Sequence, residues 1–122
     1  MSSFLIRPVP TGYKFDLKAP NGQVIATSEV YETRAACRKG IESVRKSALK
    51  AKLEDQTEES FEDVTNPKFQ LYQDKSGAFR FRLKSRNGQV VAVSEGYSTK
   101  AACENGIDSV RKNADTAEIE EA

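Results

Sequence analysis

The chain has 122 residues, with 19 Lys and Arg side chains against 18 Asp and Glu, and its formal net charge is +1. A charge this close to zero gives no global attraction to nucleic acid or to anionic lipid, so any such binding must come from a local patch. The sequence contains no His, which removes the commonest general base and the commonest metal ligand together.

One segment of the chain occurs twice. Residues 21–48 read NGQVIATSEVYETRAACRKGIESVRKSA and residues 87–114 read NGQVVAVSEGYSTKAACENGIDSVRKNA, so that each position matches the one 66 residues later. Self-similarity at a fixed offset indicates a duplicated structural unit. Each half is close to the ~60-residue length at which a lone domain is marginally stable. We therefore expect one domain, residues 1–122, in which repeat one (1–55) and repeat two (67–122) share a core.

Each half is predicted to begin with two strands. Residues 4–7 and their counterpart 69–72 are short apolar segments that end at turn residues, with Pro8 stopping the first of them. Residues 13–18 and 79–84 alternate apolar and polar side chains at a period of two, which is typical of half-buried strands.

An Asn-Gly pair follows the second strand in both halves. This pair, Asn21-Gly22 in the first half, predicts a hairpin closed by a two-residue type I′ turn, because both of its residues tolerate a positive φ. A two-residue turn sets the register of the hairpin and places Leu17 opposite Ala26. The same pairing is expected in the second half.

A helix is predicted next in each half, with Thr33 and Thr99 as N-caps. Apolar residues at helical spacing form one buried stripe per helix, which includes the two cysteines as reduced, structural side chains. A Gly within a helix costs ~1 kcal/mol relative to Ala, so Gly40 and Gly106 predict a close backbone approach to the sheet or to the other helix. The stripes are Cys37, Ile41, Val44 and Ala48, and Cys103, Ile107, Val110 and Ala114.

The repeat continues in weaker form beyond the helices, at residues 48–55 and 114–121. Alternating side chains predict a short edge strand in each half. In the first half, residues 48–53 are also good helix formers, so a longer helix is the alternative. Residues 56–66 are acidic and polar for the most part, and we expect them to form a mobile connector anchored by Phe61.

These motifs resemble those of the YegP-like proteins, a family of small domains of unknown function that are often found as tandem copies. The resemblance depends on the hairpin NGQV, the segment SExY and the helix core AACxxGIxSVRKxA, and it covers both repeats. It implies a fold of two β-β-β-α-β units that form one antiparallel sheet and exchange their last short strands. Because the apolar face of such a sheet needs a cover, we expect an α+β fold with two helices packed on that face. The resemblance implies no biochemical role.

No pattern in the sequence indicates catalysis, a cofactor or a metal site. The segment Asn-Gly-Gln-Val leads into a strand rather than a helix, unlike a phosphate loop, and the two cysteines lack the spacing and partners of a zinc site. The N-terminus lacks the basic and apolar regions of a signal peptide, and no apolar run approaches a membrane span. We therefore expect a cytoplasmic, non-enzymatic protein that does not bind membranes.

The best binding candidate is the outer face of the sheet, away from the helices. We expect a binding or interaction module that uses this face, and Ile25 is one of several apolar residues there that would meet an unknown protein partner or a second copy. The alternative is a basic row that binds single-stranded nucleic acid or another polyanion by backbone contacts and stacking, with Arg80 placed opposite Glu95. A solvated face without a ligand is the third interpretation. The candidate residues are Lys14, Lys18, Tyr72, Arg80, Arg82, Lys84, Val91 and Val93.

Overall fold

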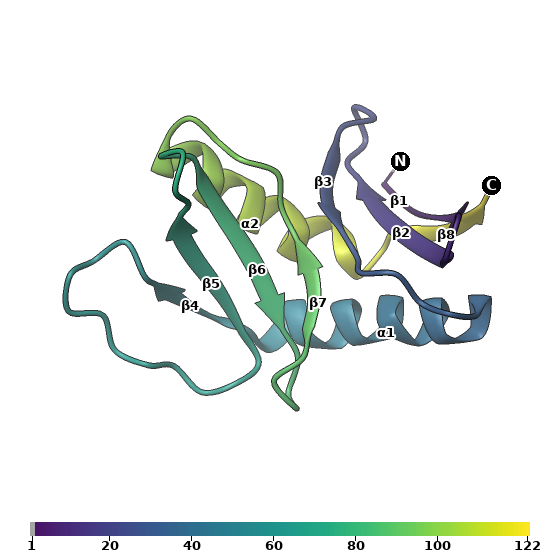
Figure 1. The fold of residues 1–122 in the computed structure, drawn as a ribbon, viewed down its shortest axis with the longest axis horizontal. Helices are drawn as coiled ribbons and strands as arrows, with labels where there is room; N and C mark the ends of the chain where they lie inside the picture. Colours follow the sequence, from purple (N-terminus) through teal and green to yellow (C-terminus); the bar gives the residue numbers. More distant parts are fainter. Residues whose placement is uncertain (1) are drawn as a thin grey trace.

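The fold is α+β, with eight strands in one sheet and two helices (Figure 1). The structure is a computed structural model and describes residues 2–122. The order of elements is three strands, a helix and a strand, and this order occurs twice. In the first half the elements are β1 (Ser3–Val9), β2 (Gly12–Lys18), β3 (Val24–Thr27), α1 (Arg34–Lys50) and β4 (Lys52–Asp55). In the second they are β5 (Lys68–Gln73), β6 (Phe79–Lys84), β7 (Val90–Val93), α2 (Lys100–Ala114) and β8 (Glu118–Glu121).

The strand order in the sheet is β4-β5-β6-β7-β3-β2-β1-β8. The last strand of each half therefore pairs with the first strand of the other half, β4 with β5 and β8 with β1. At the centre, β3 meets β7 through a single residue pair, Thr27 with Val93. The two halves are thus joined at both edges of the sheet as well as at its middle.

The expectation of a purely antiparallel sheet is wrong, because the two edge pairs are parallel. A parallel pair needs a crossover connection of about a dozen residues, since the chain must return along the length of the sheet before it re-enters. Residues 56–67 provide that return between β4 and β5. The length of the connector is explained by this pairing.

Strand β1 also extends past Pro8, which was predicted to stop it, as far as Val9. On one side the strand pairs with β2 along its whole length, with Pro8 opposite Tyr13. On the other side the pairing with β8 ends at Ile6, opposite Glu121. Pro8 therefore lies beside an unpaired edge, where a residue without an N–H is tolerated.

The hairpin turns are one residue longer than predicted. Among residues 2–122 the positive φ angles belong to glycines alone, so Asn21 does not adopt the type I′ conformation, while Gly22 has a φ of 84°. The N–H of Ala19 donates to the carbonyl of Gln23, and the N–H of Gly22 donates to the carbonyl of Ala19, both at 2.9 Å. Pro20 favours such a type I turn followed by a Gly with positive φ. The turn at Ser85–Gln89 has the same hydrogen bonds.

The predicted pairing of Leu17 with Ala26 is nevertheless confirmed, as is that of Leu83 with Ala92. A β-bulge next to each turn compensates for the extra turn residue, because Lys18 pairs with Val24 and leaves one residue of β3 unmatched. A bulge redirects side chains locally. Ile25 and Val91, predicted to lie on the outer face, are consequently buried in the hydrophobic core, with exposed fractions of 8% and 5%.

The helices follow the prediction closely. The N–H of Ala36 donates to Oγ1 of Thr33 at 3.0 Å, and Ala102 and Thr99 make the equivalent bond, which confirms both N-caps. The predicted stripes are buried in both helices, and the cysteines within them are unpaired thiols. Residues 48–53 contain both expected structures, because α1 continues to Lys50 and β4 begins at Lys52. No helix within residues 2–122 is long and apolar enough to span a membrane.

The glycines within the helices contact tyrosine side chains rather than a neighbouring backbone. A Cβ added to Gly40 would lie 2.6 Å from Cζ of Tyr31, and one added to Gly106 would lie 2.9 Å from Cζ of Tyr97. Tyr31 is itself stacked on Phe15, with ring centroids 6.3 Å apart. Each glycine therefore makes room for an aromatic ring between helix and sheet.

Candidate functional site

The outer face of the sheet carries most of the candidate residues at positions that are partly exposed. Val91 is the exception, because it is buried as described above. Ile25 is buried as well, so Val93 is the one residue of the predicted apolar patch that is partly exposed. The partly exposed candidates are Lys14, Lys18, Tyr72, Arg80, Arg82, Lys84 and Val93.

The single aromatic residue of this face is already covered. The guanidinium of Arg82 lies over the ring of Tyr72, 4.5 Å from its centroid, and Nε of Arg82 donates to Oε1 of Gln70 at 2.6 Å. A nucleic-acid base that stacks on Tyr72 must first displace this cation–π contact. The arrangement is therefore a poor stacking platform.

Arg80 is also engaged within the protein. Its Nε donates to Oδ2 of Asp74 at 2.7 Å, so that its partner lies in the β5–β6 turn and is not Glu95 as predicted. Hydrogen bonds from Ser76 and from Arg80 lower the pKa of Asp74 well below its usual range. The carboxylate is thus charged at neutral pH and compensates the guanidinium.

The first half of the face is similarly mixed in charge. Arg7 pairs with Asp16 at 2.8 Å, and Oγ1 of Thr27 donates to the other oxygen of the same carboxylate at 2.7 Å. A hollow of about 220 Å³ near the β3–β7 junction is lined by residues of both signs, including Lys14 and Glu95. The charges of this face are therefore mixed and partly paired, although Lys14, Lys18 and Lys84 have no carboxylate within ion-pair distance among residues 2–122.

A buried carboxylate lies at the β4 edge of this face. Glu54 is 1% exposed and accepts hydrogen bonds from Nζ of Lys68 at 2.6 Å, Nε2 of Gln70 at 2.9 Å and the N–H of Val64 at 2.8 Å. These bonds tie the connector to the sheet. Phe61, the predicted anchor, is 40% exposed. The period-two pattern of residues 51–55 placed Glu54 on a strand but gave no sign that the connector would cover it.

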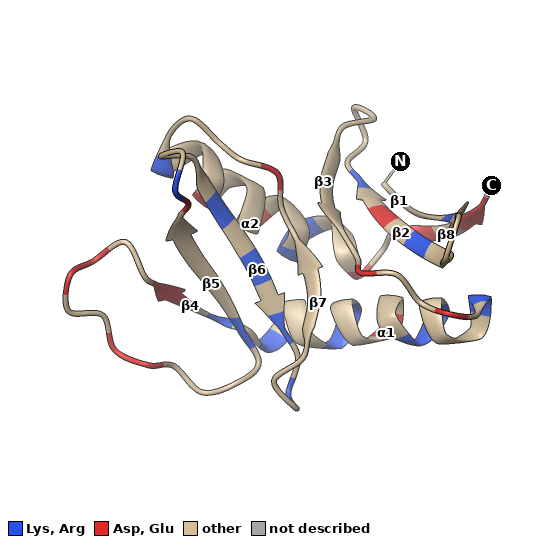
Figure 2. Cartoon of the chain, viewed as in Figure 1, with Lys and Arg blue, Asp and Glu red and all other residues tan. Residues whose placement is uncertain are grey.

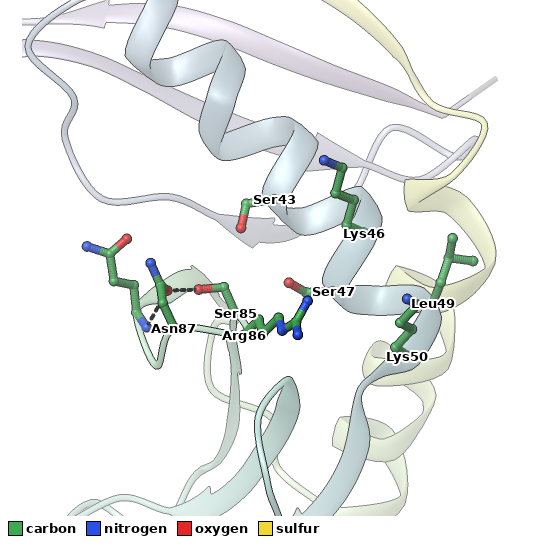
Figure 3. Close-up of a pocket in the computed structure, with 9 residues that line it drawn as sticks. Ser43, Lys46, Ser47, Leu49, Lys50, Ser85, Arg86 and Asn87 are labelled. Carbon is green, nitrogen blue, oxygen red and sulfur yellow. Dashed lines mark hydrogen bonds between the residues drawn. The ribbon is translucent and has the colours of Figure 1, made fainter.

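A larger hollow lies between the C-terminal part of α1 and the β6–β7 turn (Figure 3). It has a volume of about 780 Å³, within the range of small-ligand sites. We call it the α1–turn groove. It is lined by Ser43, Lys46, Ser47, Leu49 and Lys50 from α1, and by Ser85, Arg86, Asn87 and Gln89 from the turn.

Nearly all side chains of the α1–turn groove can donate hydrogen bonds, and Leu49, which is 62% exposed, is the apolar one. Oδ1 of Asn87 accepts from the hydroxyl of Ser85 and from the N–H of Gln89 (Figure 3). This orients the amide so that its NH₂ group is left to donate. No Asp or Glu lines the groove, so its chemistry is that of an anion site.

The cations of the groove are not neutralised by the protein. Within residues 2–122, Lys46, Lys50 and Arg86 have no carboxylate within ion-pair distance. Other cations of α1 differ, because Arg45 pairs with Glu42, and Arg34 and Arg38 both pair with Glu121. Figure 2 shows several blue segments along α1 and little red. The C-terminal part of α1 and the facing turn form a local positive patch.

The two repeats differ at this position. The equivalents of Leu49 and Lys50 are Asp115 and Thr116, which follow the end of α2, and the residue equivalent to Arg86 in the first turn is Pro20. Among the groove cations, Lys46 alone has a basic counterpart, Lys112. This divergence is visible when the two copies are aligned. The sequence therefore carried one signal for the groove, the basic residues present in one copy alone. It carried no signal for the contact between α1 and the distant turn.

A family model described as a domain of unknown function, DUF1508, matches residues 11–55 and 74–121. The chain belongs to this family. A UPF0339 protein of Mannheimia succiniciproducens is 40% identical over 109 residues, which cover 89% of this chain and 83% of that protein. A UPF0339 protein of Treponema denticola is 59% identical over 54 residues, which cover 44% of this chain and 93% of that protein.

The family also has solved structures, and the resemblance to YegP-like proteins is confirmed by one of them. The solution NMR structure of YegP from E. coli, described as a protein of unknown function, is 30% identical, with a TM-score of 0.78. The match covers 98% of this chain and 91% of that one. None of these names states an activity or a ligand, so a function for this DUF1508 protein has to be argued from its own geometry.

Proposed function

We propose that this protein is a non-enzymatic binding module that holds an anionic ligand in the α1–turn groove. The observation that carries the proposal is the set of three cations, Lys46, Lys50 and Arg86, that have no partner among the described residues and surround a hollow of about 780 Å³. Charged side chains gathered at a hollow raise the local concentration of ions of opposite sign. The net charge of the whole chain gives no such attraction.

The lining of the groove supports binding rather than catalysis. Its serines would need an adjacent general base to act as nucleophiles, and no carboxylate lines the groove. The sequence has no His to take that role. The thiols are buried in the core, and burial raises the pKa of Cys103 to about 11, so that a reactive thiolate is disfavoured.

The proposal includes a cytoplasmic location. Cys37 and Cys103 are unpaired thiols, as is usual for proteins of a reducing compartment. In this proposal the ligand is therefore an intracellular anion.

The outer face of the sheet is the competing location for an anionic ligand, and charge reversal can separate the two. One variant carries K46E, K50E and R86E in the groove, and the matched variant carries K14E, K18E and K84E on the sheet. Both change the net charge by the same amount, so differences between them report location rather than overall charge. Thermal unfolding should first show that both variants remain folded.

Retention on a heparin column at low salt is the measurement. We expect the groove variant to bind at least about tenfold more weakly than the wild type, because several charge contacts are lost, whereas the sheet variant stays close to wild type. If the sheet variant alone loses retention, the ligand binds the sheet. If the wild-type protein is not retained at all, the protein is not an anion-binding module.

A further inference from the structure

The basic groove continues along α1 as a single row of side chains. Lys39, Ser43, Lys46 and Lys50 are spaced at i, i+4, i+7 and i+11, which places them on one face of the helix. A second hollow, of about 410 Å³, is lined by Lys39 together with Arg38 and Glu42, and it shares Ser43 and Lys46 with the α1–turn groove. The two hollows are therefore adjacent along the helix.

The charge of this row is not compensated within the described residues. Arg38 and Glu42 are occupied by Glu121 and Arg45, respectively. Lys39, like the cations of the groove, has no carboxylate within ion-pair distance among residues 2–122. The equivalent positions of the second repeat are Asn105, Ser109 and Lys112 on α2 and Thr116 beyond its end, and they include one cation. The uncompensated row is a property of α1 alone.

The length of the row sets the size of the ligand. From Lys39 to Lys50 the helix rises by about 17 Å at 1.5 Å per residue. One phosphate or one small phosphorylated molecule in the groove would leave Lys39 without a partner. An extended chain of negative charges would meet all of these cations, including Arg86 across the groove.

The chemistry of the lining favours phosphates over a peptide. Lys, Arg, Ser, Asn and Gln side chains, which make up all of the groove except Leu49, are the side chains that contact sugar and phosphate groups in nucleic-acid complexes. These side chains offer several donors to phosphate oxygens, and no carboxylate lines the groove to repel them. The groove also lacks aromatic residues on which bases stack.

From these observations we infer that the ligand is a single-stranded nucleic acid whose sugar–phosphate backbone lies along α1, bound without base preference. One row of cations fits one strand, whereas a duplex presents phosphates of two strands on either side of a groove. This inference rests on the proposed function and adds the class of ligand to it.

Fluorescence anisotropy with a labelled twelve-nucleotide oligo-dT tests the inference. Four cations that each neutralise one phosphate of a single strand predict a slope of about −2.8 in a plot of log K against log salt. Lys39→Gln should reduce that slope by about 0.7 and weaken binding about fivefold at 0.1 M salt. Lys112→Gln, at the position on α2 equivalent to Lys46, is the matched control and should change neither quantity. Oligo-dA should bind as tightly as oligo-dT.

The outcomes separate this inference from the proposed function. If K39Q leaves oligo-dT binding unchanged, and pyrophosphate binds the wild type but not the groove variant, the groove takes a small anion and the inference is wrong, although the proposed function stands. If poly-glutamate or a duplex of the same length binds as tightly as oligo-dT, the ligand class is wrong. If oligo-dT binds equally to the wild type and the groove variant, both the inference and the proposed groove are wrong.

Discussion

Glu54 and Glu120 occupy equivalent positions of the two repeats but have different surroundings. Glu54 lies opposite Gln70 and accepts a hydrogen bond from it, and Lys68 on the same strand completes an ion pair. Glu120 lies opposite Leu5, which offers no donor, and is exposed. A buried carboxylate is stable only where donors replace its lost hydration. The donors around Glu54 therefore allow the connector to close over β4.

We predict that Glu54→Gln destabilises the protein by about 2–4 kcal/mol at neutral pH. The substitution leaves the ammonium of Lys68 nearly buried without its anionic partner and removes one of the acceptor oxygens of the cluster. Urea unfolding followed by circular dichroism measures this change. Glu120→Gln is the matched control and should shift the free energy of unfolding by less than about 0.5 kcal/mol. Equal effects of the two substitutions would contradict the prediction.

The same cluster predicts a dependence on acid. Burial alone would raise the pKa of Glu54, but hydrogen bonds from Lys68, Val64, Gln56 and Gln70 outweigh it and lower the pKa from 4.5 to about 2. Because the unfolded chain takes up this proton at higher pH than the folded one, the stabilisation is complete above pH 4.5 and is lost as the pH falls toward 2. The free energy of unfolding of the wild type, measured by urea unfolding, should therefore fall more steeply between pH 4.5 and 2 than that of Glu54→Gln.

At the scale of elements, each helix is fitted to the sheet by one tyrosine and one glycine. The ring of Tyr31 lies between Phe15 of β2 and Gly40 of α1, and Tyr97 lies between Phe81 and Gly106 in the same way. A glycine lowers the propensity of the helix, and the ring packed against it provides the compensating burial. Burial also raises the pKa of the Tyr31 hydroxyl.

We predict that Gly40→Ala destabilises the protein by about 1–3 kcal/mol, although Ala is the better helix former, because the ring of Tyr31 must shift to admit the new methyl group. In a Tyr31→Ala background the same substitution should stabilise the protein by up to about 1 kcal/mol. Thermal unfolding of the four proteins of this double-mutant cycle measures the coupling. An increase in stability from Gly40→Ala in the wild-type background would show that the ring does not restrict this position.

At the scale of the whole molecule, neither half can complete its own sheet. Strand β1 depends on β8 from the second half, and β5 depends on β4 from the first. Arg45 on α1 also donates to the carbonyl of Ala117, and Arg111 on α2 donates to the carbonyl of Ala51. The edges of the sheet and the ends of the helices are therefore connected across the halves.

We predict that residues 1–58 expressed alone do not unfold cooperatively as a monomer. Separation from the second half exposes one edge of β1 and leaves β4 without a neighbour, and a chain of this length has little other burial to offset the loss. Mixed with residues 59–122, the fragment should form a one-to-one complex with a single thermal transition. Light scattering and calorimetry measure both properties. A cooperative, monomeric fragment 1–58 would show that the halves are independent.

The sequence by itself determined the features that depend on neighbouring residues. The repeat, the N-caps at Thr33 and Thr99, the buried helix stripes and the inner hairpin pairing are all read from local spacing. Local spacing suffices there because capping, amphipathicity and strand alternation have fixed periods along the chain. The predicted register was right although the predicted turn type was wrong. The longer turn shifts the pairing by one residue, and the neighbouring bulge shifts it back, so Leu17 still pairs with Ala26.

Only the tertiary structure decided which distant residues meet. Residues 43–50 and 85–89 form one groove because the helix of the first repeat lies beside a turn of the second, and no periodicity in either segment encodes that contact. The burial of Ile25, Val91 and Glu54 could not be predicted from the sequence for a related reason. Whether a side chain on a strand is exposed depends on what covers it, and bulges and connectors are placed by packing of the whole chain rather than by the residues next to them.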